Sequence, residues 1–305
     1  MLSKNDVFLK NESPKRLIVM IHGYIRSPEN LMEINDTIIQ KQLGQSDVFI
    51  PALSISRTFG TELATDIVEK IAEKIDWIWN NRQNDIGKYS EVILLGHSFG
   101  GILTRALFLR AWGHKIKLGQ TNFKAECPEQ NSSFEWAPHI NRIVLLAAMN
   151  GGWTLQSAMK LRDRLLWSLG SFVGHVFFRG KTTIFSLRKG APFLTELRLA
   201  WLDFFDHNKD SPEKNPVVVQ LLGTIDDLGD PNDNIDLYTA RDFYYLEVPN
   251  SGHGNILRLT SRFHNLRQKT IRRKRRFMIC LALKGAPEVL EKRRIPISWL
   301  GETTP

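Results

Sequence analysis

Residues 92–101 read VILLGHSFGG, an apolar run that ends at a serine set between glycines. The run is typical of a buried strand, and the stretch from Phe99 to about Trp112 is typical of a helix. At such a junction Gly-x-Ser-x-Gly allows a sharp turn, because glycines lack the Cβ atoms that would collide. Ser98 would then stand at the helix N-terminus beside the backbone N–H of Phe99. The stretch therefore predicts a serine that is presented for chemistry.

Short apolar runs alternate with helical patterns along the rest of the chain. Besides the run at 92–95, strands are expected at 17–21, 48–53, 143–148, 217–222 and 243–248. Residues 62–79 predict an amphipathic helix, because apolar side chains recur there at steps of three and four. Strands that alternate with helices favour an α/β fold with a mostly parallel sheet flanked by helices.

This rhythm divides the chain into four parts. Residues 1–149 and 206–260 are expected to form the two parts of one α/β core. Residues 150–205 show no clear strand and are rich in Leu, Phe and Trp, so we expect a helical cap or lid insertion. The alternative is that these helices only fill out the core. If they do form a lid, the interspersed Arg and Lys residues would suit contact with a lipid headgroup layer. Residues 261–305 are expected to form a basic helical extension.

The net charge of +9 is concentrated near the C-terminus. Residues 258–294 contain 13 Lys and Arg residues and only two acidic residues, Glu288 and Glu291, which gives this region a net charge of +11. The rest of the chain therefore carries a net charge of −2. The run TIRRKRR at 270–276 has three interpretations: a solvated helix face, a surface for anionic membrane, or a nucleic-acid site. Nucleic acid is not expected, since no matching fold or stacking pattern accompanies the run. The apolar residues that alternate from 277 to 283 indicate that the run begins a packed element.

Several other classes of protein find no support. Cys127 and Cys280 are too few and too far apart for a disulfide framework or a zinc site. The N-terminal stretch lacks the apolar core of a secretory signal, and no segment approaches the ~20 apolar residues that cross a bilayer. GHVFFRGKTT at 174–183 has five residues between its glycines, where a nucleotide-binding loop has four. We expect a cytoplasmic protein, with peripheral membrane contact or export without a cleaved signal left open.

A serine hydroxyl needs a base, and the base needs a group that orients it. The run VVVQLLGTIDDLGD places two carboxylates directly after one expected strand, and YYLEVPNSGHGN places His253 in a glycine-flanked loop after the next. Because parallel strands end at one edge of a sheet, these side chains should approach Ser98. The alternatives are that Ser98 only caps a helix and that His253 is an ordinary loop residue. His97 is expected to be structural, with its side chain pointing away from Ser98.

Together these motifs resemble the α/β-hydrolases, and among them the lipases and esterases with a GHSxGG sequence. The matching stretches are IHGY at 21–24, GHSFGG at 96–101, GTIDD at 223–227 and SGHGN at 251–255. The order Ser, Asp, His along the chain is the one that this family uses. The resemblance extends from about residue 16 to residue 260 and leaves the basic C-terminal region unmatched.

The resemblance implies a role for each candidate residue. Ser98 would be the nucleophile, His253 the general base and Asp226 the carboxylate that orients it. The backbone N–H groups of Tyr24 and Phe99 would hold the oxyanion, and no metal or organic cofactor would be needed. The other candidates for the acid are Asp227, Asp230 and Asp233; Asp226 is favoured because related enzymes usually place the acid three residues after the glycine at this strand end.

We therefore expect a serine hydrolase that cleaves carboxylic esters of small molecules or lipids, with apolar acyl chains. Acyltransferases, thioesterases and peptidases use the same machinery, so the triad does not separate them. The rival is a non-catalytic protein on a hydrolase fold that associates with anionic membrane through residues 258–294. The acyl length, the headgroup and the oligomeric state leave no signal in the sequence.

Overall fold

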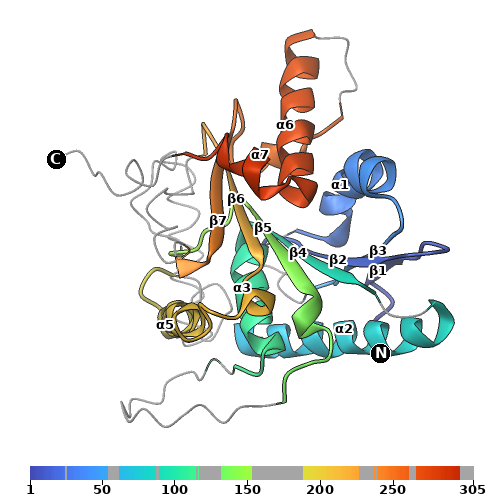
Figure 1. The fold of residues 1–305 in the computed structure, drawn as a ribbon. Coiled ribbons are helices and arrows are strands. Elements are labelled where there is room, and N and C mark those ends of the chain that lie inside the picture. Colours follow the sequence, from blue (N-terminus) through green and yellow to red (C-terminus); the bar gives the residue numbers. More distant parts are fainter. Residues whose placement is uncertain are drawn as a thin grey trace, which may run out of the picture.

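The computed structural model describes most of the chain. The described residues are 1–24, 26–53, 62–86, 89–114, 116, 132–152, 188–226, 237, 239–260 and 266–295. Their centre is a seven-stranded sheet of order β1-β3-β2-β4-β5-β6-β7 with helices on both faces (Figure 1). The strands are β1 (Val7–Leu9), β2 (Arg16–Ile21), β3 (Ser46–Ile50), β4 (Glu91–His97), β5 (Ile140–Leu146), β6 (Val217–Gly223) and β7 (Asp242–Val248).

The described helices are of two kinds. The longer ones are α2 (Ala64–Ile86), α3 (Phe99–Ala111), α5 (Pro192–His207) and α6 (Leu266–Lys284). The shorter ones are η1 (Pro28–Leu31), α1 (Met32–Ile34), η2 (Asn35–Leu43), η4 (Ala137–His139), η6 (Pro212–Lys214), η8 (Asn255–Leu257) and α7 (Pro287–Glu291). Among the described parts of the chain, no helix is both long enough and apolar enough to cross a membrane.

Strand pairing brings the strand ends together at one edge. β1 runs antiparallel to β3, and every other pair of neighbours in the sheet is parallel. The register sets Ile21 opposite Gly96 and Gly223 opposite Val248, so the carboxyl ends of β2, β4, β6 and β7 lie along the same edge. The expectation of a mostly parallel sheet is confirmed. The strand expected over 48–53 ends at Ile50, since Pro51 has no N–H to continue the ladder.

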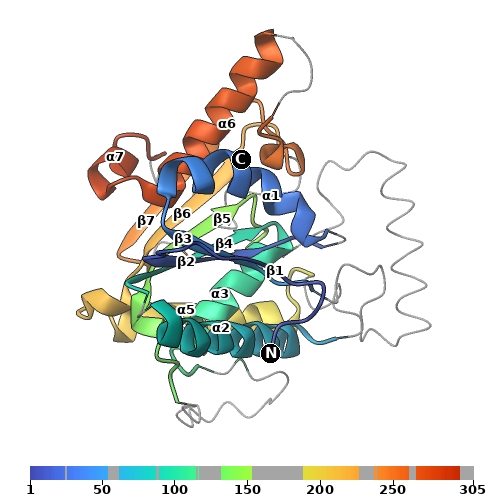
Figure 2. The ribbon, with the colours of Figure 1, turned by 90° about the vertical axis from the view of Figure 1, so that its right-hand side faces the viewer.

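The two faces of the sheet bury separate cores. Leu17, Val19 and Ile21 point to the face that α2, α3 and α5 cover. Ile18 and Met20 point to the opposite face, under η2 and α6 (Figure 2). Consecutive strand residues alternate between faces, so strands that are buried on both sides read as the unbroken apolar runs seen in the sequence.

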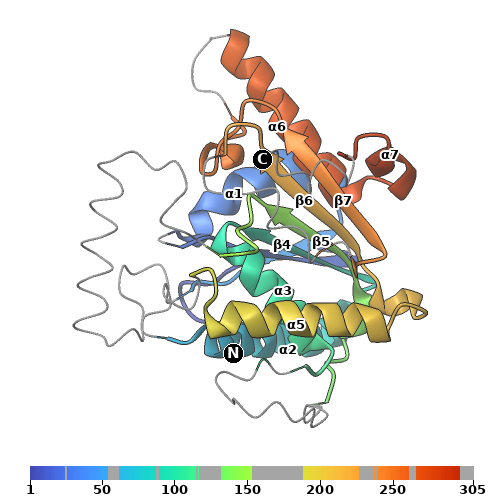
Figure 3. The same cartoon turned by 90° about the vertical axis from the view of Figure 1, so that its left-hand side faces the viewer.

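Helix α5 comes from the end of the segment expected to form a cap. It lies beside α3 on the face of the sheet (Figure 3), and its Trp201 is fully buried. The ring of Phe108 in α3 lies 5.1 Å from Phe204 and 5.9 Å from Phe205 between centroids. This part of 150–205 therefore packs on the core. Residues 153–187 lie outside the described residues, so a cap formed by them stays a prediction.

Helix α6 has a buried half and an exposed half. Its later residues Met278–Leu283 are all buried against the sheet and η2. Ile279, Leu281 and Leu283 thus belong to a packed element, whereas Phe277 is about half exposed under Arg293. The earlier half stands away from the body of the molecule (Figure 1). The basic run at 270–276 therefore leads into a core helix.

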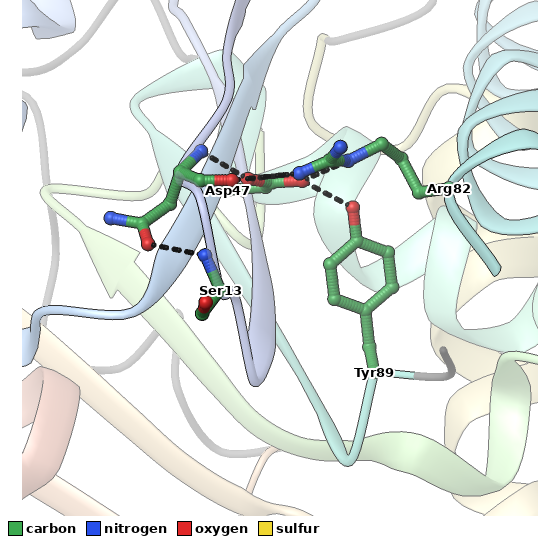
Figure 4. Close-up of polar contacts among 5 residues, drawn as sticks. Ser13, Asp47, Arg82 and Tyr89 are labelled. Atoms are coloured by element: carbon green, nitrogen blue, oxygen red, sulfur yellow. Dashed lines mark hydrogen bonds and ion pairs between the residues drawn. The ribbon is translucent and has the colours of Figure 1, made fainter. Parts of the chain in front are cut away.

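A buried ionic cluster fixes the opposite edge of the sheet, where the parallel strands begin (Figure 4). The Asp47 carboxylate accepts hydrogen bonds from Arg82 Nε at 2.8 Å, from the Tyr89 hydroxyl at 2.6 Å and from the Asn11 backbone N–H at 2.6 Å. Burial is the main cause that raises the pKa of Tyr89. The cluster joins α2 to β3 and to the segment before β4.

Candidate active site

Ser98 stands at a strained turn between β4 and α3. Its backbone has φ 55° and ψ −122°, a conformation that L residues rarely adopt. A Cβ atom on Gly96 would lie 2.4 Å from the carbonyl oxygen of Gly100, and one on Gly100 would lie 2.1 Å from that of Ile21. Neither position can hold a larger residue without a backbone shift, because both close contacts are with backbone. The glycines let the turn pack against the end of β2 while Ser98 faces the edge.

The structure brings together three of the residues selected from the sequence. His253 Nε2 lies 2.7 Å from Ser98 Oγ, and His253 Nδ1 lies 3.3 Å from Asp226 Oδ2. A carboxylate can only accept, so Nδ1 carries the hydrogen and Nε2 is left to accept from the serine hydroxyl. The Asp226 side chain is fully buried, whereas 16% of the His253 side chain is exposed. Asp227, Asp230 and Asp233 lie outside the described residues.

The loops that carry Asp226 and His253 are bonded to each other. The N–H of Ile225 donates to the Ser251 carbonyl at 3.1 Å. The N–H of Asn250 donates to Thr224 Oγ1 at 3.0 Å. A Cβ atom on Gly223 would lie 1.9 Å from the Ser251 carbonyl oxygen, so glycine is required there. The acid and the histidine are therefore positioned by one joint unit.

Arg275 of α6 forms hydrogen bonds with the same loop that carries His253. It is only 4% exposed, and its guanidinium donates to Ser251 Oγ and the Asn250 carbonyl at 2.7 Å and to Asn255 Oδ1 at 2.8 Å. These partners flank His253 on both sides in sequence. Burial lowers the pKa of Arg275, and the neighbouring charges of Arg272 and Arg258 lower it further. Arg275 thus fixes the backbone on which His253 is mounted.

Sequence reasoning did not single out Arg275, which lies inside the run TIRRKRR. A signal was nevertheless present. Helix positions three, four and seven residues after Arg275 are Met278, Ile279 and Ala282, and all of them are buried. Residues at these spacings share one helix face, so Arg275 continues the buried face into the basic run.

His97 supports the backbone of the histidine itself. It is buried, and its Nε2 donates to the carbonyl oxygen of His253 at 3.0 Å. Burial is the main cause that lowers the pKa of His97 to about 4, which keeps the ring neutral near neutral pH. The two rings lie 5.6 Å apart between centroids. That His97 has a structural role stays a prediction.

The two backbone groups selected as oxyanion donors belong to Phe99, which follows Ser98, and to Tyr24, which follows a glycine that packs against Ser98. Phe99 is the first residue of α3, and the first N–H groups of a helix have no partner within it. A Cβ atom on Gly23 would lie 3.0 Å from the Ser98 Cβ, so the turn that leads to Tyr24 passes directly against the serine. Tyr24 is half-buried, and burial raises the pKa of its hydroxyl.

A cation lies at the exposed side of the site. A Cβ atom on Gly254 would lie 3.2 Å from Arg26 Nη2, which places this guanidinium next to the residue after His253. Arg26 is exposed, and its charge contributes to the low pKa of His97. A positive charge therefore lies beside the residue that follows His253.

Comparison with known proteins agrees with this architecture. No family model and no curated protein matches the chain. Among solved structures, a monoglyceride lipase from Saccharomyces cerevisiae matches with a TM-score of 0.54 and 11% identity, over 95% of this chain and 91% of that one. Carboxyl esterase 2 from the fungus Tuber melanosporum matches with a TM-score of 0.54 and 12% identity, over 92% and 82%. A peroxisomal alpha-beta-hydrolase from S. cerevisiae matches with a TM-score of 0.51 and 12% identity, over 88% and 78%.

These similarities concern the fold, because the identities are low. The three structures share it over 88–95% of this chain. The chain has the α/β-hydrolase fold.

Proposed function

We propose that this protein is a serine hydrolase that cleaves carboxylic esters. The observation that carries the proposal is the continuous chain of contacts from Ser98 Oγ through the His253 ring to the buried Asp226 carboxylate. Two of the similar structures are a monoglyceride lipase and a carboxyl esterase by name, which favours esters as the substrate class.

The geometry supports catalysis in two halves. Ser98 Oγ attacks the acyl carbon while its proton passes to His253 Nε2, and Asp226 stabilises the imidazolium that forms. His253 then gives this proton to the alcohol oxygen as the ester bond breaks, which leaves an acyl group on Ser98. A water molecule, deprotonated by His253, attacks the acyl carbon and releases the acid. The serine regains its proton at the end, so the cycle balances.

Negative charge on the substrate carbonyl oxygen needs donors in both halves. The backbone N–H groups of Phe99 and Tyr24 are proposed to supply them, since Phe99 follows Ser98 and the glycine before Tyr24 packs against it. The N-terminal end of α3 adds a favourable dipole at the same place. The substrate is proposed to have an apolar acyl chain, and thioesters or acyl transfer remain within reach of the same machinery.

Hydrolysis of p-nitrophenyl butyrate tests the proposal. Ser98→Ala should lower kcat by roughly a thousandfold or more, because the nucleophile is lost, while thermal unfolding is little changed. Ser90→Ala is the matched control, since Ser90 is an exposed serine at the opposite edge. A Ser98→Ala protein with undiminished turnover would contradict the assignment. A wild-type protein inactive on every ester tested would favour the non-catalytic alternative.

A further inference from the structure

The first part of α6 projects from the edge of the molecule that holds the site. We call residues 266–274 the basic arm. Its base is Arg275, which is bonded to the His253 loop, while the far end of α6 is held at the start of β5 by Arg142, which donates to the Ala282 carbonyl at 2.8 Å. The helix therefore runs from the opposite edge past the histidine loop. At 1.5 Å per residue, the arm reaches about 13 Å beyond Arg275, on the side where the parallel strands end (Figure 3).

The arm carries positive charge without compensation. Its basic residues are Arg267, Lys269, Arg272, Arg273 and Lys274. The sequence contains no acidic residue from 248 to 287, and no carboxylate among the described residues forms an ion pair with the arm. Residues 266–270 are exposed, and Leu266 at the tip is 78% exposed. An exposed leucine at the end of a basic helix suits the boundary between headgroups and acyl chains.

Three guanidinium groups gather where the arm meets the body. Burial lowers the pKa of Arg275, and the nearby charges of Arg272 and Arg258 lower it further. Arg272 Nε is buried and makes no hydrogen bond within the described residues. An anionic group bound here would relieve the repulsion and give this nitrogen a partner.

We propose that the basic arm docks on the anionic phospholipid headgroups of a membrane and sets the Ser98 site against the bilayer. Docking itself does not depend on catalysis; only the delivery of a lipid ester to Ser98 rests on the proposed function. The arm contains no aromatic residue on which nucleic-acid bases could stack, and its tip is apolar, so lipid is favoured over nucleic acid. Each basic side chain near an anionic surface contributes about a fivefold factor in binding, which salt weakens.

Co-sedimentation with vesicles tests docking without using turnover. The protein carries Ser98→Ala throughout, and the vesicles are phosphatidylcholine with or without one third phosphatidylglycerol. We expect binding to the anionic vesicles only, and its loss in high salt. The arm variant combines Arg267→Gln, Lys269→Gln, Arg273→Gln and Lys274→Gln, and should bind at least about tenfold more weakly. The matched control combines Lys15→Gln, Lys41→Gln, Arg198→Gln and Lys209→Gln, which removes equal charge from exposed sites on the body.

Three results would overturn the proposal. The wild-type arm could fail to bind anionic vesicles, or the arm variant could bind as well as the control. Alternatively, a short DNA duplex could bind in an arm-dependent way and displace the vesicles, which would make the arm a nucleic-acid site. Thermal unfolding of both variants shows that they are folded. Because ester turnover is measured separately, failed docking and failed hydrolysis are distinguishable.

Discussion

Arg275 joins the basic helix α6 to the loop that carries His253, so its loss should act on catalysis through position. Arg275→Gln removes the guanidinium that donates to the buried Ser251 hydroxyl, the Asn250 carbonyl and Asn255 Oδ1, which should cost about 1–3 kcal/mol of stability. We expect kcat on p-nitrophenyl butyrate to fall about tenfold to hundredfold with little change in KM, because His253 is displaced from Ser98. Steady-state kinetics of the folded variant measures both.

The control is Arg273→Gln, an exposed neighbour in the same helix that makes no contact with the loop. It should keep wild-type kcat on this soluble substrate. If Arg275→Gln loses stability but keeps kcat, Arg275 supports the fold alone and has no positioning role.

His97 gives stability a defined pH dependence. Burial lowers its pKa in the folded protein to about 4 from the ordinary value of 6.5, so the unfolded chain binds more protons between these pH values. Stability should therefore rise as pH increases from 4 to 6.5 and be lost as pH falls through the same window, by up to about 3 kcal/mol.

Urea denaturation across this window, compared between wild type and His97→Gln, isolates the effect. His22 and His114 also have lowered pKa values from burial, and their contribution is common to both proteins. The variant should show the shallower dependence on pH. Equal slopes for the two proteins would show that His97 does not titrate as the structure requires.

At the scale of elements, the Asp47 cluster lies at the edge where the parallel strands begin, and the candidate active site lies at the edge where they end. The Asp47 cluster ties α2 to the amino-terminal edge, far from Ser98 (Figure 4). Asp47→Asn removes the carboxylate that pairs with the buried Arg82 guanidinium, so the free energy of unfolding should fall by about 3–5 kcal/mol. Ester turnover by the folded fraction should stay unchanged, because the site lies at the other edge.

Urea denaturation of Asp47→Asn checks the size of this loss. Glu291→Gln is a control that breaks an exposed ion pair, at 3.2 Å from Arg294, and should change stability little. A loss equally small for Asp47→Asn would mean that the cluster does not hold this edge.

The same elements show what the sequence could predict. β2, β4, β5, β6 and β7 could be predicted because each contains a mostly apolar run that is followed by turn residues. β1 was not expected, since Val7–Leu9 is too short for periodicity to indicate a strand. The start of β3 was missed because it contains a charged residue, Asp47, which is buried only through partners from distant segments.

The site divides in the same way. Ser98, Asp226 and His253 could be selected because glycines and strand ends mark each of them in the sequence. Their mutual distances depend on the order of β4, β6 and β7 in the sheet, which local patterns do not encode. Arg275 could not be selected from the sequence, because it lies in a run of basic residues that is typical of a solvated helix face. Only the structure shows that it shares a buried face of α6 with Met278.

At the scale of the whole molecule, the basic arm and the candidate active site lie on the same side of the sheet, where the parallel strands end. The body is slightly acidic, while the excess positive charge lies in the region that contains α6, whose arm extends on the side where the parallel strands end (Figure 3). Arg26 adds a further positive charge beside Gly254, the residue after His253. If the basic arm docks as proposed, this asymmetry would orient the protein on an anionic surface before any specific contact forms.

The account depends most on the reactivity of one hydroxyl group, and covalent labelling measures it directly. A fluorophosphonate probe with an alkyl chain should add once to the wild-type protein, and peptide mapping should place the adduct on Ser98. Ser98→Ala should remain unlabelled, and His253→Gln should react far more slowly because the serine loses its base. A folded wild-type protein that stays unlabelled, or an adduct on any other residue, would contradict the central claim.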